Sequence, residues 1–241
     1  MQAPVCSCAN AFSSAEVYRE SPHLNPPCGA PSILDETMTD TLSTIKARTS
    51  ANNFDTTHVL TSAEIEELVS YAQHAPTAFN LQNWRALAFS TKAQKEALKG
   101  AAYGQQKVAD AAVTFVITGI KDGYKEIARL AKPLLDAGAI DKAAYDGWVG
   151  MTVGSHENNP QLQHDEAFRS ASLAAMTLML AAQAKGYVSG PMSGFDPAAV
   201  SKVASLGDNE IPVILVAVGR AAPGNWPRKP RRALSEQVKI F

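Results

Sequence analysis

Cysteine is scarce in this 241-residue chain, and its three cysteines, Cys6, Cys8 and Cys28, all lie within the first thirty residues. The rest of the chain cannot be cross-linked by disulfides, which favours a reducing, cytoplasmic location. Together with His23 the cysteines have ligand types suited to a metal, but their spacing matches no common zinc pattern and the surroundings are rich in Ser, Pro and Ala. We therefore expect no metal site.

An excess of charge is also lacking, since 22 Lys and Arg stand against 23 Asp and Glu, for a formal net charge of -1. A chain without a basic field has little attraction for nucleic acid or anionic lipid. The longest apolar run, residues 171–184, falls short of the ~20 apolar residues that span a bilayer, and indicates a buried helix. We expect neither nucleic acid nor a membrane as a partner.

Residues 1–37 lack apolar periodicity and an apolar stretch of signal-peptide length, and contain scattered Pro, Ser and Asn. We expect a disordered N-terminal extension. Met38 is followed by a short helical pattern over residues 40–47, so one hypothesis makes Met38 the natural start. With 46% hydrophobic residues the chain can bury one core, and residues 38–241 are expected to form a single domain.

Capping signals predict several helices. Thr61 and Glu64 have capping-box spacing at the start of an amphipathic pattern that ends near Ala75, before Pro76. Thr91 predicts the start of a second helix, which runs to about Ala102. Further helices are predicted over residues 166–185, closed by Gly186, and from Asp196 and Pro197, with Gly207 near the end.

Strands are predicted around residues 86–90 and, as nearly continuous apolar runs suited to central positions, over residues 111–118 and 211–219. Helices before, between and after a few separated strands predict an α+β fold. Residues 121–165 mix Gly, Pro, Asn, His and aromatic residues and indicate an inserted lid or loop. The sequence contains neither a G-x-G-x-x-G turn nor a P-loop, so a Rossmann nicotinamide site or an NTPase has no support.

Four segments are informative together: Arg48-Thr49-Ser50-Ala51-Asn52-Asn53-Phe54, residues 75–85, Gly190-Pro191-Met192-Ser193-Gly194-Phe195-Asp196, and Lys229-Pro230-Arg231. In order, spacing and content they resemble the FMN-dependent nitroreductase family, from about residue 40 to the C-terminus. The resemblance implies a central mixed or antiparallel sheet flanked by helices, in an intertwined homodimer with FMN at each interface site.

The activity implied by the resemblance is a ping-pong reaction. NADH or NADPH reduces FMN, which then reduces a small-molecule acceptor: a nitroaromatic, a quinone or an activated alkene. The same fold serves other flavin chemistries, so reductive dehalogenation and flavin destruction stay open, as do a flavin-binding or redox-sensing protein without turnover and a purely structural dimerisation module. The sequence does not discriminate between NADH and NADPH.

The resemblance also implies the cofactor contacts. Arg48, Ser50, Lys229 and Arg231 match phosphate-binding positions, and Lys107 and Gln105 match positions at the flavin ring, where a cation favours the reduced form. The Gly194 segment matches the backbone that donates to flavin N5. Pro76, Thr77 and Asn80 match positions that reach the flavin of the neighbouring subunit. The full predicted set is Arg48, Thr49, Ser50, Asn52, Pro76, Thr77, Ala78, Asn80, Gln105, Lys107, Pro191, Met192, Ser193, Gly194, Lys229 and Arg231.

The sequence departs from the family pattern at Asn52, where an arginine or lysine is usual, and this change bears on how the reduced flavin is stabilised. Asn83 replaces a common proline, which bears on loop stiffness. Tyr124, Tyr145 and Trp148 either shape the acceptor pocket or serve packing and dimer contact. We interpret His58, His74, His156 and His164 as surface or helix-end residues and assign no catalytic side chain.

Overall fold

The computed structural model describes residues 41–241. The predictions for the first 37 residues and for Met38 lie outside the described residues. Within the described part, four strands form one antiparallel sheet in the order β1 (Trp84–Phe89), β2 (Val113–Ile120), β4 (Glu210–Gly219) and β3 (Val188–Met192). The α+β class is confirmed, as is the central position of the two apolar strands, and among the described strands every pairing is antiparallel.

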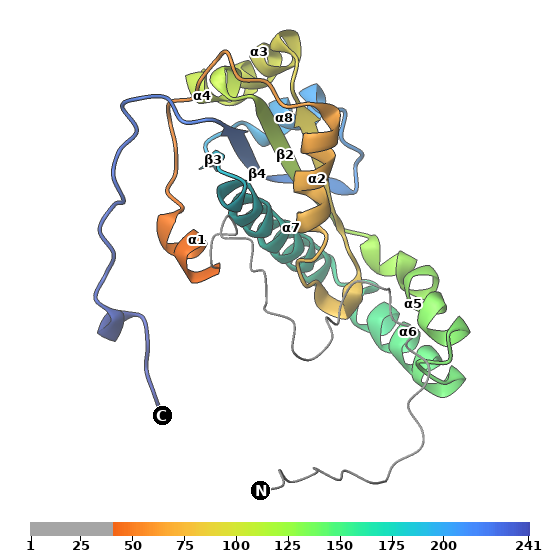
Figure 1. Ribbon diagram of the computed structural model, residues 1–241. Helices are drawn as coiled ribbons and strands as arrows, with labels where there is room; N and C mark the ends of the chain where they lie inside the picture. Colours follow the sequence, from red (N-terminus) through yellow and green to blue (C-terminus); the bar gives the residue numbers. More distant parts are fainter. Residues whose placement is uncertain (1–40) are drawn as a thin grey trace, which may run out of the picture. The chain divides into compact units, whose positions relative to one another are not determined.

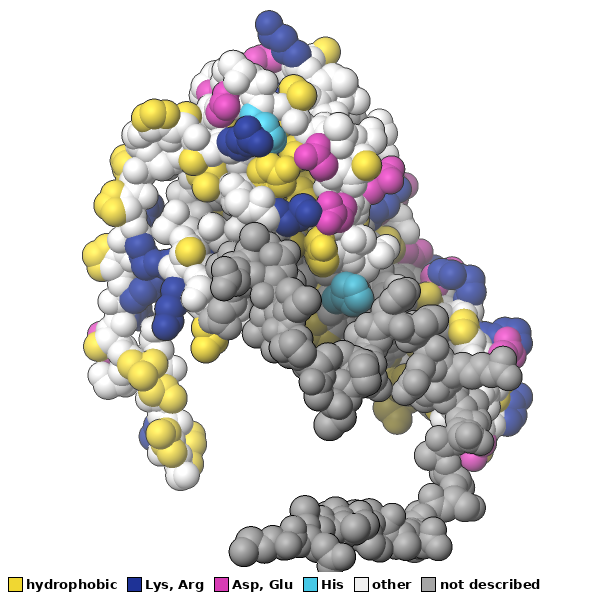
Figure 2. Space-filling model, viewed as in Figure 1, with side chains coloured by type: hydrophobic (Ala, Val, Ile, Leu, Met, Phe, Trp, Pro, Cys, Tyr) yellow, Lys and Arg dark blue, Asp and Glu magenta, His cyan; other side chains and the backbone are white. Residues whose placement is uncertain are grey.

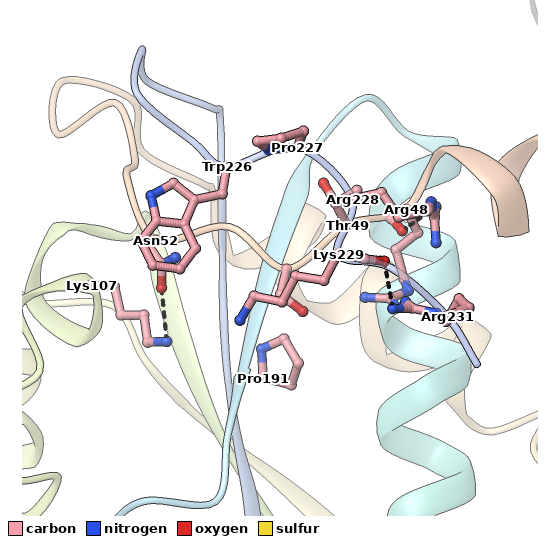
Figure 3. Close-up of a pocket in the computed structure, with 11 residues that line it drawn as sticks. Arg48, Thr49, Asn52, Lys107, Pro191, Trp226, Pro227, Arg228, Lys229 and Arg231 are labelled. Carbon is pink, nitrogen blue, oxygen red and sulfur yellow. Dashed lines mark hydrogen bonds between the residues drawn. The ribbon is translucent and has the colours of Figure 1, made fainter.

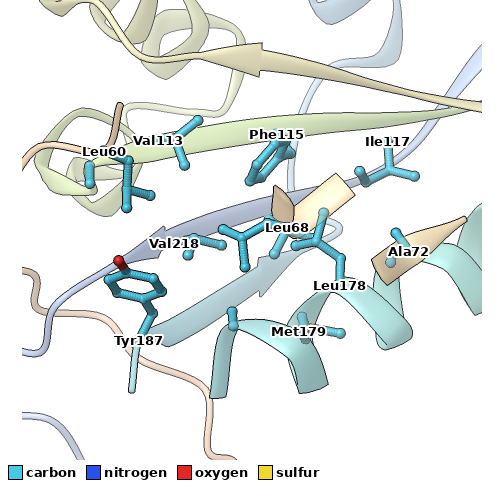
Figure 4. Close-up of a cluster of buried hydrophobic side chains, with 14 of the residues drawn as sticks. Leu60, Leu68, Ala72, Val113, Phe115, Ile117, Leu178, Met179, Tyr187 and Val218 are labelled. Atoms are coloured by element: carbon cyan, nitrogen blue, oxygen red, sulfur yellow. The ribbon is translucent and has the colours of Figure 1, made fainter. Parts of the chain in front are cut away.

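One face of the sheet is covered by α7 (Pro160–Ala184) and α2 (Ser62–Ala72), as Figure 1 shows. Phe115 and Ile117 of β2 point into this layer and pack with Leu68 of α2 and Leu178 of α7 (Figure 4). The approach of strand and helix is close, because a Cβ at Gly119 would lie 2.5 Å from the carbonyl oxygen of Ala167. Glycine is therefore the residue that lets β2 lie against α7.

The opposite face is covered by α3 (Lys92–Ala101), α4 (Gln106–Asp110) and α8 (Pro197–Val203). Val116 lies between Phe115 and Ile117 in sequence but packs in this second layer, with Leu98, Val108 and Val200. Side chains of a strand alternate between faces, so a strand buried on both sides is apolar throughout. The continuous apolar runs predicted the two central strands for this reason.

The capping box of Thr61 and Glu64 at the start of α2 is confirmed, and so is the cap at Thr91 before α3, where Gln94 completes a second capping box that was not predicted. α2 ends at Ala72 rather than near Ala75, since the residue before a proline is disfavoured in helical geometry and the last turn loosens ahead of Pro76.

The start of α7 and the end of α8 also differ from the predicted positions by a few residues. α7 begins at Pro160, six residues before the predicted start, with the Asn159 side chain accepting a hydrogen bond from the Leu162 backbone. α8 ends at Val203, and Ser205, at φ 51°, reverses the chain there instead of Gly207.

β3 was not predicted as a strand, because it contains Gly190 and Pro191 and has no apolar alternation. In the described sheet β3 pairs with β4 alone, so it is an edge strand there. Proline is tolerated at an edge, where a missing N–H removes no sheet bond. This edge carries the site described below.

Residues 121–165 fold as η2 (Gly123–Glu126), α5 (Ile127–Asp136), α6 (Lys142–His156) and the start of α7. They have a small apolar core of their own, where Tyr124 is buried and Tyr145 and Trp148 pack against it. His156 ends α6, as expected of a helix-end residue, but it is buried and not on the surface. Its ring stacks on that of Tyr124 with centroids 5.6 Å apart.

Two segments border the site beyond the core: α1 (Thr41–Ala47) and the chain that follows β4. Figure 1 shows the chain after β4 running past α1 to the C-terminus, with a single turn, η3 (Leu234–Glu236). Side chains of residues 226–241 are all exposed. Among the described residues no helix is long and apolar enough to cross a membrane.

Candidate functional site

A cavity of about 280 Å³ opens beside β3, between the chain that follows α1 and the chain that follows β4 (Figure 3). It brings together eight of the predicted residues, from four segments that are far apart in sequence, and the lining also includes three that were not predicted. The predicted residues are Arg48, Thr49, Ser50, Asn52, Lys107, Pro191, Lys229 and Arg231. Three of the four sequence motifs, together with Lys107, therefore meet in one pocket.

The first wall is held by backbone pairing. Ser50 forms a parallel bridge with Ser189 of β3, and the Ala51 N–H donates to the Ser189 carbonyl oxygen across 2.9 Å. The neighbouring Gly190 leaves room for this contact, since a Cβ there would lie 2.5 Å from the Ala51 carbonyl oxygen. The Gly-Pro pair of the third motif thus seats the first motif against the sheet.

The second wall comes from residues 226–231, which follow β4. Arg228 donates through Nη2 to the carbonyl oxygen of Arg48 across 2.7 Å, and it also donates to the carbonyl oxygen of Lys46 in the last turn of α1. A guanidinium at a helix C-terminus satisfies carbonyl groups that have no helical partner. Arg228 therefore fixes the end of α1 and the backbone of Arg48 together.

The pocket is strongly cationic. Five of its eleven described lining residues are Arg48, Lys107, Arg228, Lys229 and Arg231, and none of the eleven is acidic. Burial, and then the charges of Arg228 and Arg231, lower the pKa of Arg48. Burial and the charge of Lys229 lower the pKa of Lys107. Both shifts mean that the positive charge is less favourable in this pocket than in water, and an anion that enters would offset this cost.

Arg48 shows what kind of anion fits. Its Nε and Nη1 atoms are buried and have no hydrogen-bond partner among the described residues. A guanidinium presents its donors as a planar fork, which suits the paired oxygens of a phosphate or carboxylate. The unpaired donors and the surrounding cations fit a doubly charged phosphate group.

The other end of the pocket is less charged. Lys107 Nζ donates to the Asn52 side-chain oxygen across 3.2 Å, and both residues line the pocket, as does Trp226 (Figure 3). Gln105 Nε2 donates to the Gly194 carbonyl oxygen across 2.6 Å, which ties the α4 start to the segment after β3. Ser193 and Gly194 are exposed beside this contact, whereas Met192 is buried in the second core layer.

Pro76, Thr77, Ala78 and Asn80 do not line this pocket. They lie in the loop after α2 and in η1 (Ala78–Asn80), where Thr77 Oγ1 accepts a hydrogen bond from the Gln82 backbone. This loop has left-handed backbone angles at three non-glycine residues, Phe79, Asn80 and Gln82. Such angles persist only where the surroundings enforce them and are concentrated at functional sites. The assignment of Pro76, Thr77 and Asn80 to the flavin site of a neighbouring subunit stays a prediction.

The aromatic residues of the lid also lie away from the cavity. Tyr124 is buried against His156, and the Tyr145 hydroxyl donates to the Ala128 carbonyl oxygen across 3.0 Å. Within the described residues their contacts are those of packing, which was one of the two interpretations offered by the sequence.

Sequence reasoning missed three lining residues, Trp226, Pro227 and Arg228. A signal was present, because residues 228–232 are a basic run in a chain of nearly zero net charge. Lys229 in that run lies 5.4 Å from the Trp226 ring centre, in a cation–π contact.

Comparisons with known proteins agree with this arrangement. The model of the nitroreductase family matches residues 45–220. MhqN of Bacillus subtilis, named as an NAD(P)H nitroreductase, is 35% identical over 199 residues, 82% of this chain and 97% of that protein. The crystal structure of the B. subtilis nitroreductase YdfN superposes with a TM-score of 0.80 at 34% identity and covers 83% of this chain and 98% of that one. The CLA biosynthesis enone reductase of Lactiplantibacillus plantarum is 27% identical over 73% of this chain and 82% of that protein.

Proposed function

This chain belongs to the nitroreductase family, and from that premise we propose that it is an NAD(P)H-dependent oxidoreductase that holds FMN in the cationic pocket beside β3. It passes the electrons to a nitroaromatic, a quinone or an activated alkene. The alkene acceptors are in keeping with the related enone reductase, which is 27% identical to this chain over 179 residues.

The observation that carries the proposal is the unpaired guanidinium of Arg48 amid four other cations. Buried donors without partners cost free energy, so such a site is favoured when a ligand supplies the acceptors. FMN ends in a phosphate, and the pocket offers the charges and the forked donors that a phosphate requires. Arg48, Ser50, Lys229 and Arg231 would hold this group.

FMN, when bound, supplies the hydride chemistry, and the protein's own residues supply position and electrostatics. Lys107 would favour negative charge at the flavin ring, because its ammonium is a cation in the pocket lining. This ammonium also donates to the Asn52 side-chain oxygen across 3.2 Å. Gln105, tied to Gly194, would fix the backbone that borders the ring edge. Trp226, an exposed residue of the pocket lining, would limit the access of water from the solvent side.

We further propose that the working unit is a homodimer with FMN at each interface. The last nine residues, 233–241, expose four large apolar side chains, Leu234, Val238, Ile240 and Phe241. Leu42 and Ile45 of α1, and Phe168 and Leu173 of α7, are exposed as well (Figure 2 shows part of this surface). Apolar surface of this extent is typical of an interface. A second copy would cover it and bring the loop after α2 to the flavin.

An absorbance spectrum of the freshly purified protein tests the function, followed by anaerobic addition of NADH or NADPH. Flavin bands that bleach with one nucleotide and return with a nitroaromatic, quinone or enone are the expected result, and they identify the donor. A protein that neither takes up FMN nor oxidises NAD(P)H contradicts the proposal. Flavin that bleaches but drives no turnover indicates a sensor, and flavin consumed during turnover indicates the destructive chemistry.

A further inference from the structure

Asn225, directly before the cationic segment, uses every hydrogen-bonding position of its side chain. Its Oδ1 accepts from the backbone N–H groups of Asn52 and Asn53, across 2.7 and 2.9 Å. Its Nδ2 donates to the carbonyl oxygens of Asn53 and Ala222, across 2.8 and 3.0 Å. A carboxamide has two acceptor sites and two donor hydrogens, so no other side chain of this size could make the same four bonds.

These bonds join the two walls of the pocket at one point. Asn52 and Asn53 lie in the first motif, whereas Asn225 directly precedes Trp226 and lies three residues before Arg228. The backbone supports the same junction, since Ala222 N–H donates to Asn53 O across 3.1 Å and Phe54 bridges with Ala221. Gly224, at φ 90°, permits the turn that brings Asn225 round to face the first wall.

Beyond this junction the cationic segment has little else to order it. Residues 226–231 are exposed and carry no regular secondary structure. Arg228 provides one further attachment, to carbonyl oxygens of Lys46 and Arg48. An exposed segment without such anchors samples many conformations, and each ordered residue costs conformational entropy.

We propose that Asn225 is a positioning residue that sets the register of residues 226–231 against residues 48–52, so that the cations are assembled before FMN binds. It acts through Arg228, Lys229 and Arg231, because its own side-chain donors and acceptors are all occupied by protein backbone. The two consecutive N–H groups of Asn52 and Asn53 are also taken, so side-chain cations rather than these amides hold the phosphate. This inference rests on the proposed function for the identity of the ligand.

Loss of the Asn225 side chain should weaken the binding of a flavin that carries a phosphate more than the binding of one that lacks it. If the loss of Asn225 leaves the segment in its binding geometry for a tenth of the time, the apparent dissociation constant of FMN rises about tenfold. Riboflavin has the same ring without the phosphate, so its affinity should change by less than about twofold. A general loss of folding would weaken both ligands equally.

The experiment compares full-length wild type, Asn225→Ala and Asn225→Asp, with Asn209→Ala as the matched control. Asn209 is another loop asparagine, whose side chain donates to Asp122 away from the pocket. FMN and riboflavin affinities are measured by flavin fluorescence, and hydrogen exchange of the Asn52 and Asn53 amides is measured in flavin-free protein. Asn225→Asp keeps the two acceptor bonds and loses the two donor bonds, so its amides should stay protected while its FMN affinity falls less than in Asn225→Ala.

Faster exchange at both amides in Asn225→Ala, with a selective loss of FMN affinity, supports the proposal. Unchanged exchange overturns it, as does FMN affinity within twofold of wild type or an equal loss for riboflavin. A wild type that binds neither flavin contradicts the proposed function instead. The exchange measurement still decides in that case whether Asn225 holds the two walls together, because it uses protein without flavin.

Discussion

The Lys107 ammonium donates to the side-chain oxygen of Asn52 across 3.2 Å, from α4 to the segment that follows α1. In the family pattern a second cation is usual at the asparagine position. Here the pair has one charge instead of two, and the lysine has gained a neutral acceptor. The neutral partner offsets part of the cost of burying Lys107, whose pKa is lowered by burial and by Lys229.

Asn52→Lys should raise the reduction potential of bound FMN, because a second cation at the ring favours the more negative reduced form. A shift on the order of 30 mV corresponds to about 1.4 kcal/mol for a two-electron couple. The measurement is a redox titration against reference dyes, with Asn52→Gln as the uncharged control. An unchanged or lower potential in Asn52→Lys would show that this position does not act on the ring.

Arg231→Ala should lower FMN retention by on the order of 1.5–3 kcal/mol, through loss of a charge-assisted phosphate contact. Arg232→Ala removes the same charge one residue further along, outside the residues that line the cavity, and is the matched control. Both are compared by FMN titration at two salt concentrations. If Arg231→Ala binds FMN with the same affinity as wild type, Arg231 does not contact the phosphate.

Arg48→Met should change the free energy of unfolding and the affinity for FMN in opposite directions. Burial and the charges of Arg228 and Arg231 disfavour the charged guanidinium in the free pocket. The flavin-free variant should therefore have a higher free energy of unfolding than wild type, although it binds FMN more weakly. Urea unfolding of the flavin-free proteins measures the first effect, with Lys46→Met on α1 as the control. A flavin-free variant less stable than wild type would contradict the electrostatic account.

Glu64 should contribute a pH-dependent part of the stability. Hydrogen bonds from the backbone and hydroxyl of Thr61, at 2.8 and 2.7 Å, lower its pKa. Because the folded-state pKa lies below the unfolded one, the contribution is present above the ordinary glutamate value of about 4.3 and is lost as pH falls through the lowered pKa. Glu64→Gln should thus be destabilised relative to wild type at about pH 7 and much less at about pH 3.

Urea unfolding at the two pH values provides this comparison, and Glu66→Gln on the same helix is the control. A deficit in Glu64→Gln that persists undiminished at low pH would mean that packing, and not the ionised capping box, is responsible.

Removal of residues 233–241 should convert the proposed dimer to monomer, because it deletes four exposed apolar side chains and leaves the lining of the pocket in place. Analytical ultracentrifugation of the truncated and full-length proteins measures this change. Substitution of Leu234 and Ile240 by serine in the full-length chain distinguishes apolar contact from chain length. If the truncated protein sediments as wild type does, residues 233–241 are not part of the dimer interface.

The sequence predicted best where the determinants are local. The capping box of Thr61 and Glu64 needs only residues three apart, the cap at Thr91 depends on the residue just before its helix, and continuous apolar runs indicate the central strands. Eight pocket residues followed from motifs that could be matched as a set.

What could not be predicted depends on partners distant in sequence. β3 is recognisable as a strand only beside β4, since its own Gly190 and Pro191 argue against one. Arg228 gains its role from carbonyl groups of Lys46 and Arg48, some 180 residues earlier. His156 belongs to a polar class that is mostly exposed, yet it is enclosed by Tyr124 and Phe79, from elements outside its own helix.

The order of the segments along the chain has a consequence for biosynthesis. β4 ends at Gly219, whereas the cations Arg228, Lys229 and Arg231 come later. A polypeptide emerging from the ribosome can thus complete its sheet and both core layers while half of the pocket is still unmade. A protease that cuts just after Gly219 would remove these cations and, with them, the flavin, so the yellow of bound flavin would report that the chain has been made and kept as far as Arg231.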